Sequence, residues 1–182
     1  MAETKGSWRG TKLGPMSGDE MDAFLGGPWL ARVACLTPDG APYIVPLWYH
    51  WDRAAFWIVG RERSEWAHYL SADPRVSLVV DESEPPIRKV ICEGTAVVVE
   101  EPVGPYLDNG EKSIWNQIGE QHTGPRYLGD KATEYRGGVN VEPCWTIRID
   151  PTKLITWQGF GWHPRYRHPE LYFDSGDNDP SR

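Results

Sequence analysis

Residues 42–70 read PYIVPLWYHWDRAAFWIVGRERSEWAHYL, and the interpretation of the whole chain starts from this segment. Two apolar, aromatic-rich runs flank a turn at residues 52–53, which predicts a pair of strands. Arg61, Arg63 and Ser64 follow, where we predict that the second strand gives way to a short helix. Two arginines beside the free N–H groups of a helix N-terminus suit a phosphate group. The tryptophans and tyrosines upstream suit a flat ring, so the segment predicts a site for a phosphorylated aromatic cofactor.

The hydrophobic and charged fractions are ordinary for a globular protein with one sizeable core, whereas the ten tryptophans are an excess that suits binding sites and interfaces as well as cores. The net charge of -7 argues against a protein that binds a nucleic-acid backbone, which requires a basic face. The first residues lack the apolar run of a signal peptide, and no run approaches transmembrane length. The cysteines, Cys35, Cys92 and Cys144, lie singly in apolar runs, which favours buried, reduced thiols. We therefore expect a soluble cytoplasmic protein.

Six or seven strands are expected along the chain, with one or two helices inserted late. Residues 30–37, 42–51 and 55–60 predict three consecutive strands in an antiparallel meander, with Pro46 at a sheet edge or bulge. A later long strand is expected to bulge at Gly94. Two final strands are expected to meet at a turn at residues 150–151. This pattern is typical of a mainly β protein that forms a closed or split barrel.

The predicted helices and boundaries complete the organisation. Ser17 and Glu20 form a capping-box pattern, which predicts a short helix up to Leu25. We expect an N-terminal arm over residues 1–16, one domain over 17–173 and a disordered tail over 174–182. Within the domain we expect a helical insertion at about 103–140.

The chain resembles the pyridoxamine 5'-phosphate oxidase-like, FMN-binding split-barrel family. The motifs that carry the resemblance are P-Y-I-V-P-L-W-Y, S-E-W-A-H-Y-L-S-A-D-P-R-V-S-L and V-x-x-E-G-T-A, over residues 30–100. A shorter match is T-W-Q-G followed by His163, Arg165 and Arg167, near the end of the chain. The resemblance implies a six-stranded Greek-key split barrel that forms a homodimer with FMN at the interface.

The resemblance also implies roles for individual residues. The isoalloxazine ring is expected on Val45, Pro46 and Leu47, and the ribityl chain on Ile58, Val59 and Gly60. Ser64 is expected to hold the phosphate. Trp157 and Arg167 are expected to reach the flavin from the partner chain. Many family members carry a basic pair after the serine, whereas this chain has Glu65 and Trp66, so we expect Arg61 and Arg63 to supply the positive charge.

The remaining aromatic and basic residues have two open interpretations each. Trp48 and Trp66 are predicted to contact the flavin, with core packing as the alternative. Tyr49, His163 and Arg165 are predicted on the substrate side of the site, with a core position or a solvated turn as the alternatives. None of the five histidines fits a metal-ligand motif, so no metal site is predicted.

These features favour an FMN-dependent oxidoreductase that transfers hydride or electrons between reduced flavin and a small, flat, conjugated substrate. The cofactor would carry the chemistry, and no catalytic residue is identified from the sequence. One alternative is an F420-dependent reductase of the same fold, with Arg126, Lys131 and Arg136 beside the cofactor's anionic tail. Another alternative is a non-catalytic protein that binds flavin or haem. The expected partners are a second copy of the chain and a small molecule, without nucleic acid or membrane.

Overall fold

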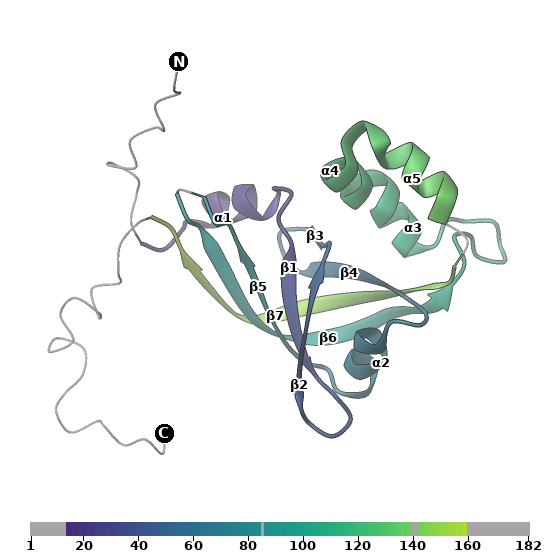
Figure 1. Cartoon of the computed structure of the whole chain (residues 1–182), viewed down its shortest axis with the longest axis horizontal. Helices are drawn as coiled ribbons and strands as arrows, with labels where there is room; N and C mark the ends of the chain where they lie inside the picture. The colour runs from purple at the N-terminus through teal and green to yellow at the C-terminus, as the bar shows by residue number, and fades with distance from the viewer. Residues whose placement is uncertain (1–13, 85, 140–141, 160–182) are drawn as a thin grey trace, which may run out of the picture.

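The computed structural model describes residues 14–84, 86–139 and 142–159, and over these ranges the chain is mainly β (Figure 1). Seven strands form one antiparallel sheet in the order β2-β1-β5-β6-β7-β4-β3. The sheet curves around an apolar core as a split barrel. The predicted fold class is confirmed, with seven strands in place of six. The strands are β1 (Ala31–Leu36), β2 (Pro42–Leu47), β3 (His50–Trp51), β4 (Phe56–Arg61), β5 (Arg75–Asp81), β6 (Lys89–Val103) and β7 (Cys144–Trp157).

The additional strand arises because the predicted strand over residues 42–51 is interrupted at Trp48. Its first part, β2, pairs with β1, and its second part, β3, pairs with β4. β2 and β3 therefore lie at opposite ends of the strand order. Both antiparallel pairings of the predicted meander are present, with its middle strand divided into two. Pro46 is on the edge strand β2, as expected for a residue without an N–H donor.

Strand β7 is continuous where the sequence predicted two strands and a turn. Cys144 pairs with the end of β4, and the strand runs through Pro151 to Trp157. The pairing of β6 with β7 shifts register between Glu93 and Gly94, opposite Pro151. The predicted bulge at Gly94 is confirmed, and it explains the continuity, because the bulge accommodates the proline without ending the strand.

The N-terminal helix α1 (Gly18–Leu25) begins as the sequence predicts. Ser17 accepts a hydrogen bond from the Glu20 N–H, and the Glu20 carboxylate accepts one from the Ser17 N–H. Residues 14–16, which were expected in an N-terminal arm, are attached to the end of β7 and the residue that follows it. Gly14 pairs with Gln158, and the buried Met16 donates its N–H to Thr156.

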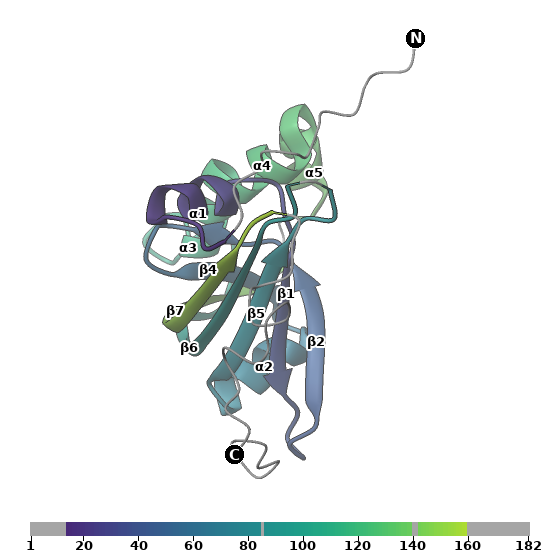
Figure 2. The same ribbon diagram turned by 90° about the vertical axis from the view of Figure 1, so that its left-hand side faces the viewer.

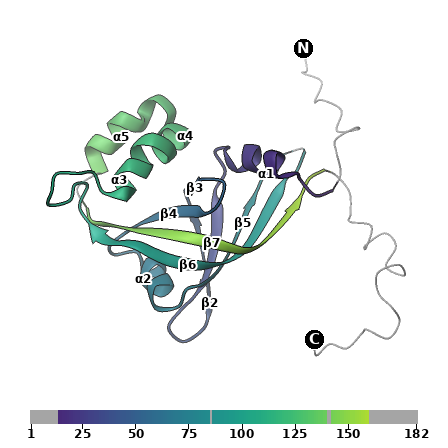
Figure 3. The ribbon, with the colours of Figure 1, turned by 180° about the vertical axis from the view of Figure 1, so that it is seen from behind.

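Helix α2 (Glu65–Ala72) closes the core below β4 (Figures 1 and 3). The short helix predicted after Ser64 is confirmed by this element, and Trp66, Ala67 and Leu70 lie on its buried face. They join the cluster formed by the inner faces of the strands and by α1. The same face of β4 therefore belongs to the core, and the opposite face is left for other contacts.

The opposite side of β4 is covered by the segment between β6 and β7 (Figures 1 and 2). This helical insertion consists of α3 (Ile114–Ile118), a π-helical turn η1 (Gly119–Thr123), α4 (Gly124–Leu128), a 3₁₀ turn η2 (Gly129–Lys131) and α5 (Ala132–Val139). In the described ranges, no helix is long and apolar enough to cross a membrane.

The start of the insertion is attached to the sheet through Glu100 on β6. Its carboxylate accepts hydrogen bonds from the N–H groups of Ile114 and Trp115 at the start of α3. The same carboxylate accepts a hydrogen bond from the Thr146 hydroxyl on β7, at 2.9 Å. A carboxylate at a helix N-terminus stabilises it through both the hydrogen bonds and the helix dipole.

The middle of the insertion attaches through aromatic stacking. Trp48 stacks on Tyr127, with ring centroids 5.0 Å apart and an interplanar angle of 4°. His50 stacks on His122, with centroids 3.7 Å apart and an angle of 8°. The Tyr127 hydroxyl donates to the Trp29 carbonyl at 2.7 Å. Trp48, His50 and the Trp29 carbonyl thus form the surface that the insertion contacts.

Candidate functional site

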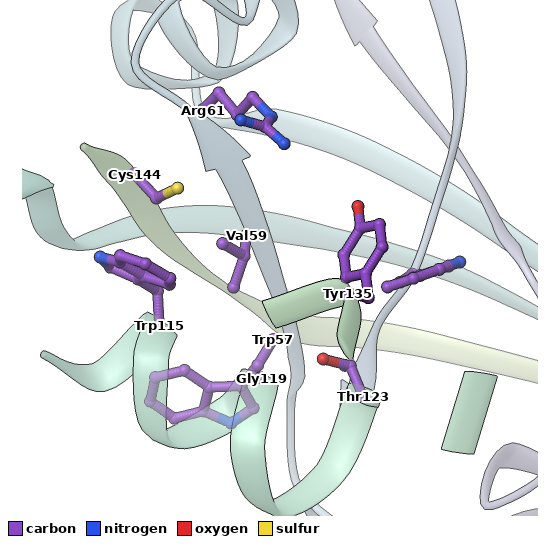
Figure 4. Close-up of a pocket in the computed structure, with 9 residues that line it drawn as sticks. Trp57, Val59, Arg61, Trp115, Gly119, Thr123, Tyr135 and Cys144 are labelled. Atoms are coloured by element: carbon purple, nitrogen blue, oxygen red, sulfur yellow. The ribbon is translucent and has the colours of Figure 1, made fainter. Parts of the chain in front are cut away.

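A pocket lies between the outer face of β4 and the helical insertion (Figure 4). We call it the aromatic pocket, and its cavity volume is about 170 Å³. It is lined by Trp48, Trp57, Val59, Arg61, Trp115, Gly119, Thr123, Tyr135 and Cys144. Four of these nine residues are tryptophan or tyrosine, so the walls offer flat, largely apolar surfaces to a ligand.

The floor of the aromatic pocket is the outer face of β4. Residues two apart on a strand share one face, and Trp57, Val59 and Arg61 accordingly all line the pocket (Figure 4). Phe56 and Ile58, which alternate with these residues along β4, are fully buried in the core. Val59 lies between the indole ring at one end and the guanidinium group at the other.

Gly60 marks the closest approach of β4 to α2. A Cβ atom at this position would lie 2.7 Å from ring atoms of Trp66. Only glycine accommodates this contact without a shift of either element. Trp66 therefore packs against the inner face of β4, whereas the pocket lies on the outer face.

The walls come from the insertion and from the segment that follows β2. Trp115 belongs to α3 and Tyr135 to α5, and the π-helical turn contributes Gly119 and Thr123. π-Helical turns are rare and are found often at functional sites. A second cavity of about 70 Å³ extends among the helices and shares Trp48 and Trp115 with the aromatic pocket.

The charged end of the pocket is an ion-pair cluster. Glu142, just before β7, accepts hydrogen bonds from Nη1 of Arg61 at 2.7 Å and from Nη1 of Arg63 at 2.5 Å. These bonds lower the pKa of Glu142 to about 2. The nearby Ser64 precedes α2, but its hydroxyl makes no capping hydrogen bond to that helix. Two guanidinium groups and one hydroxyl are thus grouped where β4 ends.

The thiol at this end of the pocket belongs to the buried Cys144. Burial raises the pKa of Cys144 to about 11, so the group stays protonated at neutral pH. Cys35 and Cys92 are likewise buried and unpaired, as the sequence predicted for all three cysteines.

Three predicted cofactor residues, Trp48, Val59 and Arg61, are brought together in the aromatic pocket. Arg63 joins them through the shared contact with Glu142. Val45, Pro46 and Leu47 lie on the edge strand β2 and do not line the cavity. Their predicted contact with a ring remains a prediction.

Three predicted site residues have side chains that fill the core of this chain, and their predicted contacts remain predictions. Tyr49 is fully buried, and its hydroxyl donates to the Leu25 carbonyl at 2.9 Å. Ile58 is also fully buried in the core. Trp66 packs under Gly60, on the face of β4 away from the pocket. In each case the side chain fills the core, which was the alternative interpretation for Tyr49 and Trp66.

Trp157 does not line this pocket. Trp157 pairs with Lys89 at the far end of β7, whereas the aromatic pocket adjoins the first residue of that strand. Its predicted contact across a dimer remains a prediction. His163, Arg165 and Arg167 lie outside the described residues.

Four residues of the site were not predicted from the sequence: Trp57, Trp115, Tyr135 and Glu142. Trp57 carried a signal, because it is two residues before Val59 on a predicted strand and shares its face. The other three come from the insertion and from the connection that follows it, and no local pattern relates them to β4.

The family model described as pyridoxamine 5'-phosphate oxidase matches residues 17–156. The chain belongs to this family. No curated protein sequence matches the chain significantly. Family membership fixes the split-barrel framework and leaves the reaction open, because folds of this kind host several functions.

Three similar solved structures illustrate that range. An FAD-binding protein from Mesorhizobium loti has a TM-score of 0.55 and 21% identity, over 84% of this chain and 100% of that one. A structure named F420 reductase has a TM-score of 0.52 and 20% identity, over 74% and 94%. The haem storage protein HutZ from Vibrio cholerae has a TM-score of 0.55 and 17% identity, over 79% and 95%. At these identities the likeness establishes the fold alone.

Proposed function

We propose that this member of the pyridoxamine 5'-phosphate oxidase family is an FMN-dependent oxidoreductase acting on a small, flat, conjugated substrate. The observation that carries the proposal is the aromatic pocket, in which an apolar, ring-lined floor ends at paired arginines. A bound flavin would supply the hydride or electron transfer, and the protein's own groups would bind, orient and exclude water.

The residues present fit the two chemically distinct parts of FMN. Trp57, Val59 and Trp115 offer an apolar surface to a planar ring system. Arg61 and Arg63 offer guanidinium forks that match phosphate oxygens. Because Arg61 also lines the pocket, one strand presents both surfaces to the same ligand.

The size of the pocket supports a site shared between two chains. Pockets for ligands of this class measure about 300–1,000 Å³. The aromatic pocket measures about 170 Å³, so one chain encloses part of such a ligand. We propose that a second copy completes the site as a homodimer, and the C-terminal residues that include Trp157 are the proposed contribution of the partner.

The substrate is proposed to stack beside the flavin ring under the insertion. Trp48 and Tyr135 lie on the insertion side of the pocket, and the adjoining 70 Å³ cavity has the same aromatic walls. These surfaces favour flat, apolar molecules and exclude water from the ring.

The other cofactors have less support from the described residues. Arg126, expected beside the tail of F420, donates to the Tyr49 carbonyl at 3.0 Å and so serves the attachment of the insertion. A haem requires an axial ligand, and none of the histidines in the described ranges lines the aromatic pocket. FMN remains the cofactor that matches both the ring-lined floor and the arginines.

The test is the identity of the ligand that the protein carries and prefers. Absorbance and mass spectra of material released from the purified protein are expected to show FMN, and added FMN is expected to raise the melting temperature. F420 and haem serve as comparison ligands in the same assay. A colourless protein that no flavin stabilises would refute the proposal, and a Soret band would identify a haem protein.

A further inference from the structure

The contact that closes the charged end of the aromatic pocket is made by a carboxylate. One oxygen of Glu142, Oε2, accepts hydrogen bonds from both Arg61 and Arg63. A glutamate carboxylate is charged at neutral pH, and the two arginines lower the pKa of Glu142 further, to about 2. A negatively charged oxygen therefore occupies the point at which the two guanidinium groups converge.

A phosphate monoester bound by Arg61 and Arg63 would place an oxygen where the Glu142 oxygen lies. Guanidinium groups bind carboxylate and phosphate through the same arrangement of N–H donors. A phosphate dianion a few ångströms from a carboxylate is repelled by it, and the repulsion is only partly screened at a half-exposed site. Glu62 and Glu65 flank the arginines in sequence and add negative charge to the neighbourhood. Phosphate and the Glu142 carboxylate therefore compete for Arg61 and Arg63.

The backbone beside Glu142 allows such an exchange without a change of fold. The Glu62 N–H donates to the Pro143 carbonyl at 2.9 Å, which fixes the chain one residue after Glu142. The next residue, Cys144, is already paired with Arg61 in the sheet. The Glu142 side chain is 37% exposed, so it has solvent into which to turn.

We propose that Glu142 is an internal competitor of the cofactor's phosphate, which weakens the binding of all dianionic phosphates, so that a phosphate is retained at the arginines only when a ring of the same ligand also fills the aromatic pocket. This inference rests on the proposed function, in which the aromatic pocket holds the ring of FMN. A free phosphate gains nothing from the aromatic walls, whereas FMN gains from both ends of the site. The carboxylate thus prevents small phosphates from occupying the arginines.

The experiment compares FMN with riboflavin, which has the same ring and no phosphate. Dissociation constants are measured by flavin fluorescence for the wild type and for Glu142→Gln, which removes the charge and keeps the size. The variant is expected to bind FMN about tenfold more tightly and riboflavin equally well. Glu93→Gln is the control, because Glu93 pairs with Lys153 at an exposed position and does not line the pocket. This variant is expected to bind FMN and riboflavin as the wild type does.

Inorganic phosphate provides a second readout that does not depend on flavin. Nuclear magnetic resonance signals of the Arg61 and Arg63 Nε–H groups are followed while phosphate is added to each protein. Tighter phosphate binding by Glu142→Gln supports the proposal even if no flavin binds, a result that would refute only the proposed function. Unchanged or weaker binding of both FMN and phosphate by the variant would overturn the role of Glu142.

Discussion

Gly60 is the residue at which the core and the aromatic pocket are separated. Its missing side chain lets β4 lie against the Trp66 ring, while its neighbours Val59 and Arg61 face the pocket. The position of the pocket floor therefore depends on a contact made on the opposite face of the same strand.

Replacing Gly60 by alanine is expected to lower the free energy of unfolding by about 1–3 kcal/mol, the usual cost of overpacking a well-filled core. The new Cβ would lie 2.7 Å from Trp66 ring atoms, so the buried ring, the helix or the strand must shift. Urea denaturation measures the change. Gly18→Ala is the matched control, because nothing lies within 4 Å of a Cβ there. Equal stability of the Gly60 variant and the control would contradict the account.

Outside the aromatic pocket, the buried carboxylate of Glu82 forms an ion pair with the partly exposed Arg88. The Glu82 side chain is 4% exposed, and Arg88 donates to it from Nε at 2.7 Å and from Nη2 at 2.8 Å. The Arg88 guanidinium also lies 4.9 Å from the centre of the Phe24 ring in α1.

Substituting Arg88 by methionine is expected to lower the free energy of unfolding by about 2–3 kcal/mol, because a buried carboxylate loses its charged partner. Lys153→Met removes one member of an exposed pair with Glu93 and is expected to cost less than about 1 kcal/mol. Chemical denaturation of both variants measures the difference. If the Arg88 variant loses no more free energy of unfolding than the Lys153 variant does, the Glu82–Arg88 pair does not stabilise the fold.

At the scale of elements, the stacked pair of His50 and His122 joins β3 to the insertion. Burial is the main cause of the lowered pKa of His50, which is about 4, and repulsion by His122 and Arg126 adds to it. Burial and Arg126 lower the pKa of His122 as well. Asp52 acts in the opposite direction on His50 but does not compensate.

The attachment of the insertion is therefore expected to weaken in acid. Histidines released from the stack regain a pKa of about 6.5, so below this pH the detached state binds more protons than the attached state. The stabilisation is complete above pH 6.5 and is lost progressively as the pH falls towards 4. Hydrogen exchange of residues 113–139, corrected for intrinsic rates, should show less protection at pH 5 than at pH 7.5.

The matched variant for this prediction is His122→Phe, which keeps a ring for stacking and cannot take up a proton. Its protection is expected to change less with pH than that of the wild type. If both proteins lose protection equally between the two pH values, the histidine pair does not control the attachment.

The sequence predicted elements whose determinants are local. The capping box at Ser17, the helical spacing of Trp66 and Leu70 and the glycine bulge at Gly94 all define their structures within a few residues. The interruption at Trp48 was not predictable in this way, because it depends on β2 and β3 reaching opposite edges of the sheet. The pocket walls were missed for the same reason, since Trp115 meets β4 only through the fold of the insertion.

At the scale of the whole molecule, the proposed FMN site requires two chains. The aromatic pocket of one chain is smaller than a typical ligand site, and exposed apolar side chains remain on the strands, including Ile44 at 67% exposure. Light scattering after size-exclusion chromatography is expected to give about twice the chain mass of 20.7 kDa, with two FMN molecules per dimer. A stable particle of one chain that binds FMN fully would contradict the shared site.

The most direct test of the central claim is equilibrium binding of FMN to a protein whose aromatic pocket has been filled. Val59→Trp places a second indole at the middle of the pocket floor, whereas Val99→Trp changes a partly exposed valine outside the lining. The Val59 variant is expected to bind FMN at least about tenfold more weakly than the wild type. The Val99 variant is expected to bind FMN as tightly as the wild type. Unchanged FMN affinity in a folded Val59→Trp protein would show that the flavin ring does not lie in this pocket.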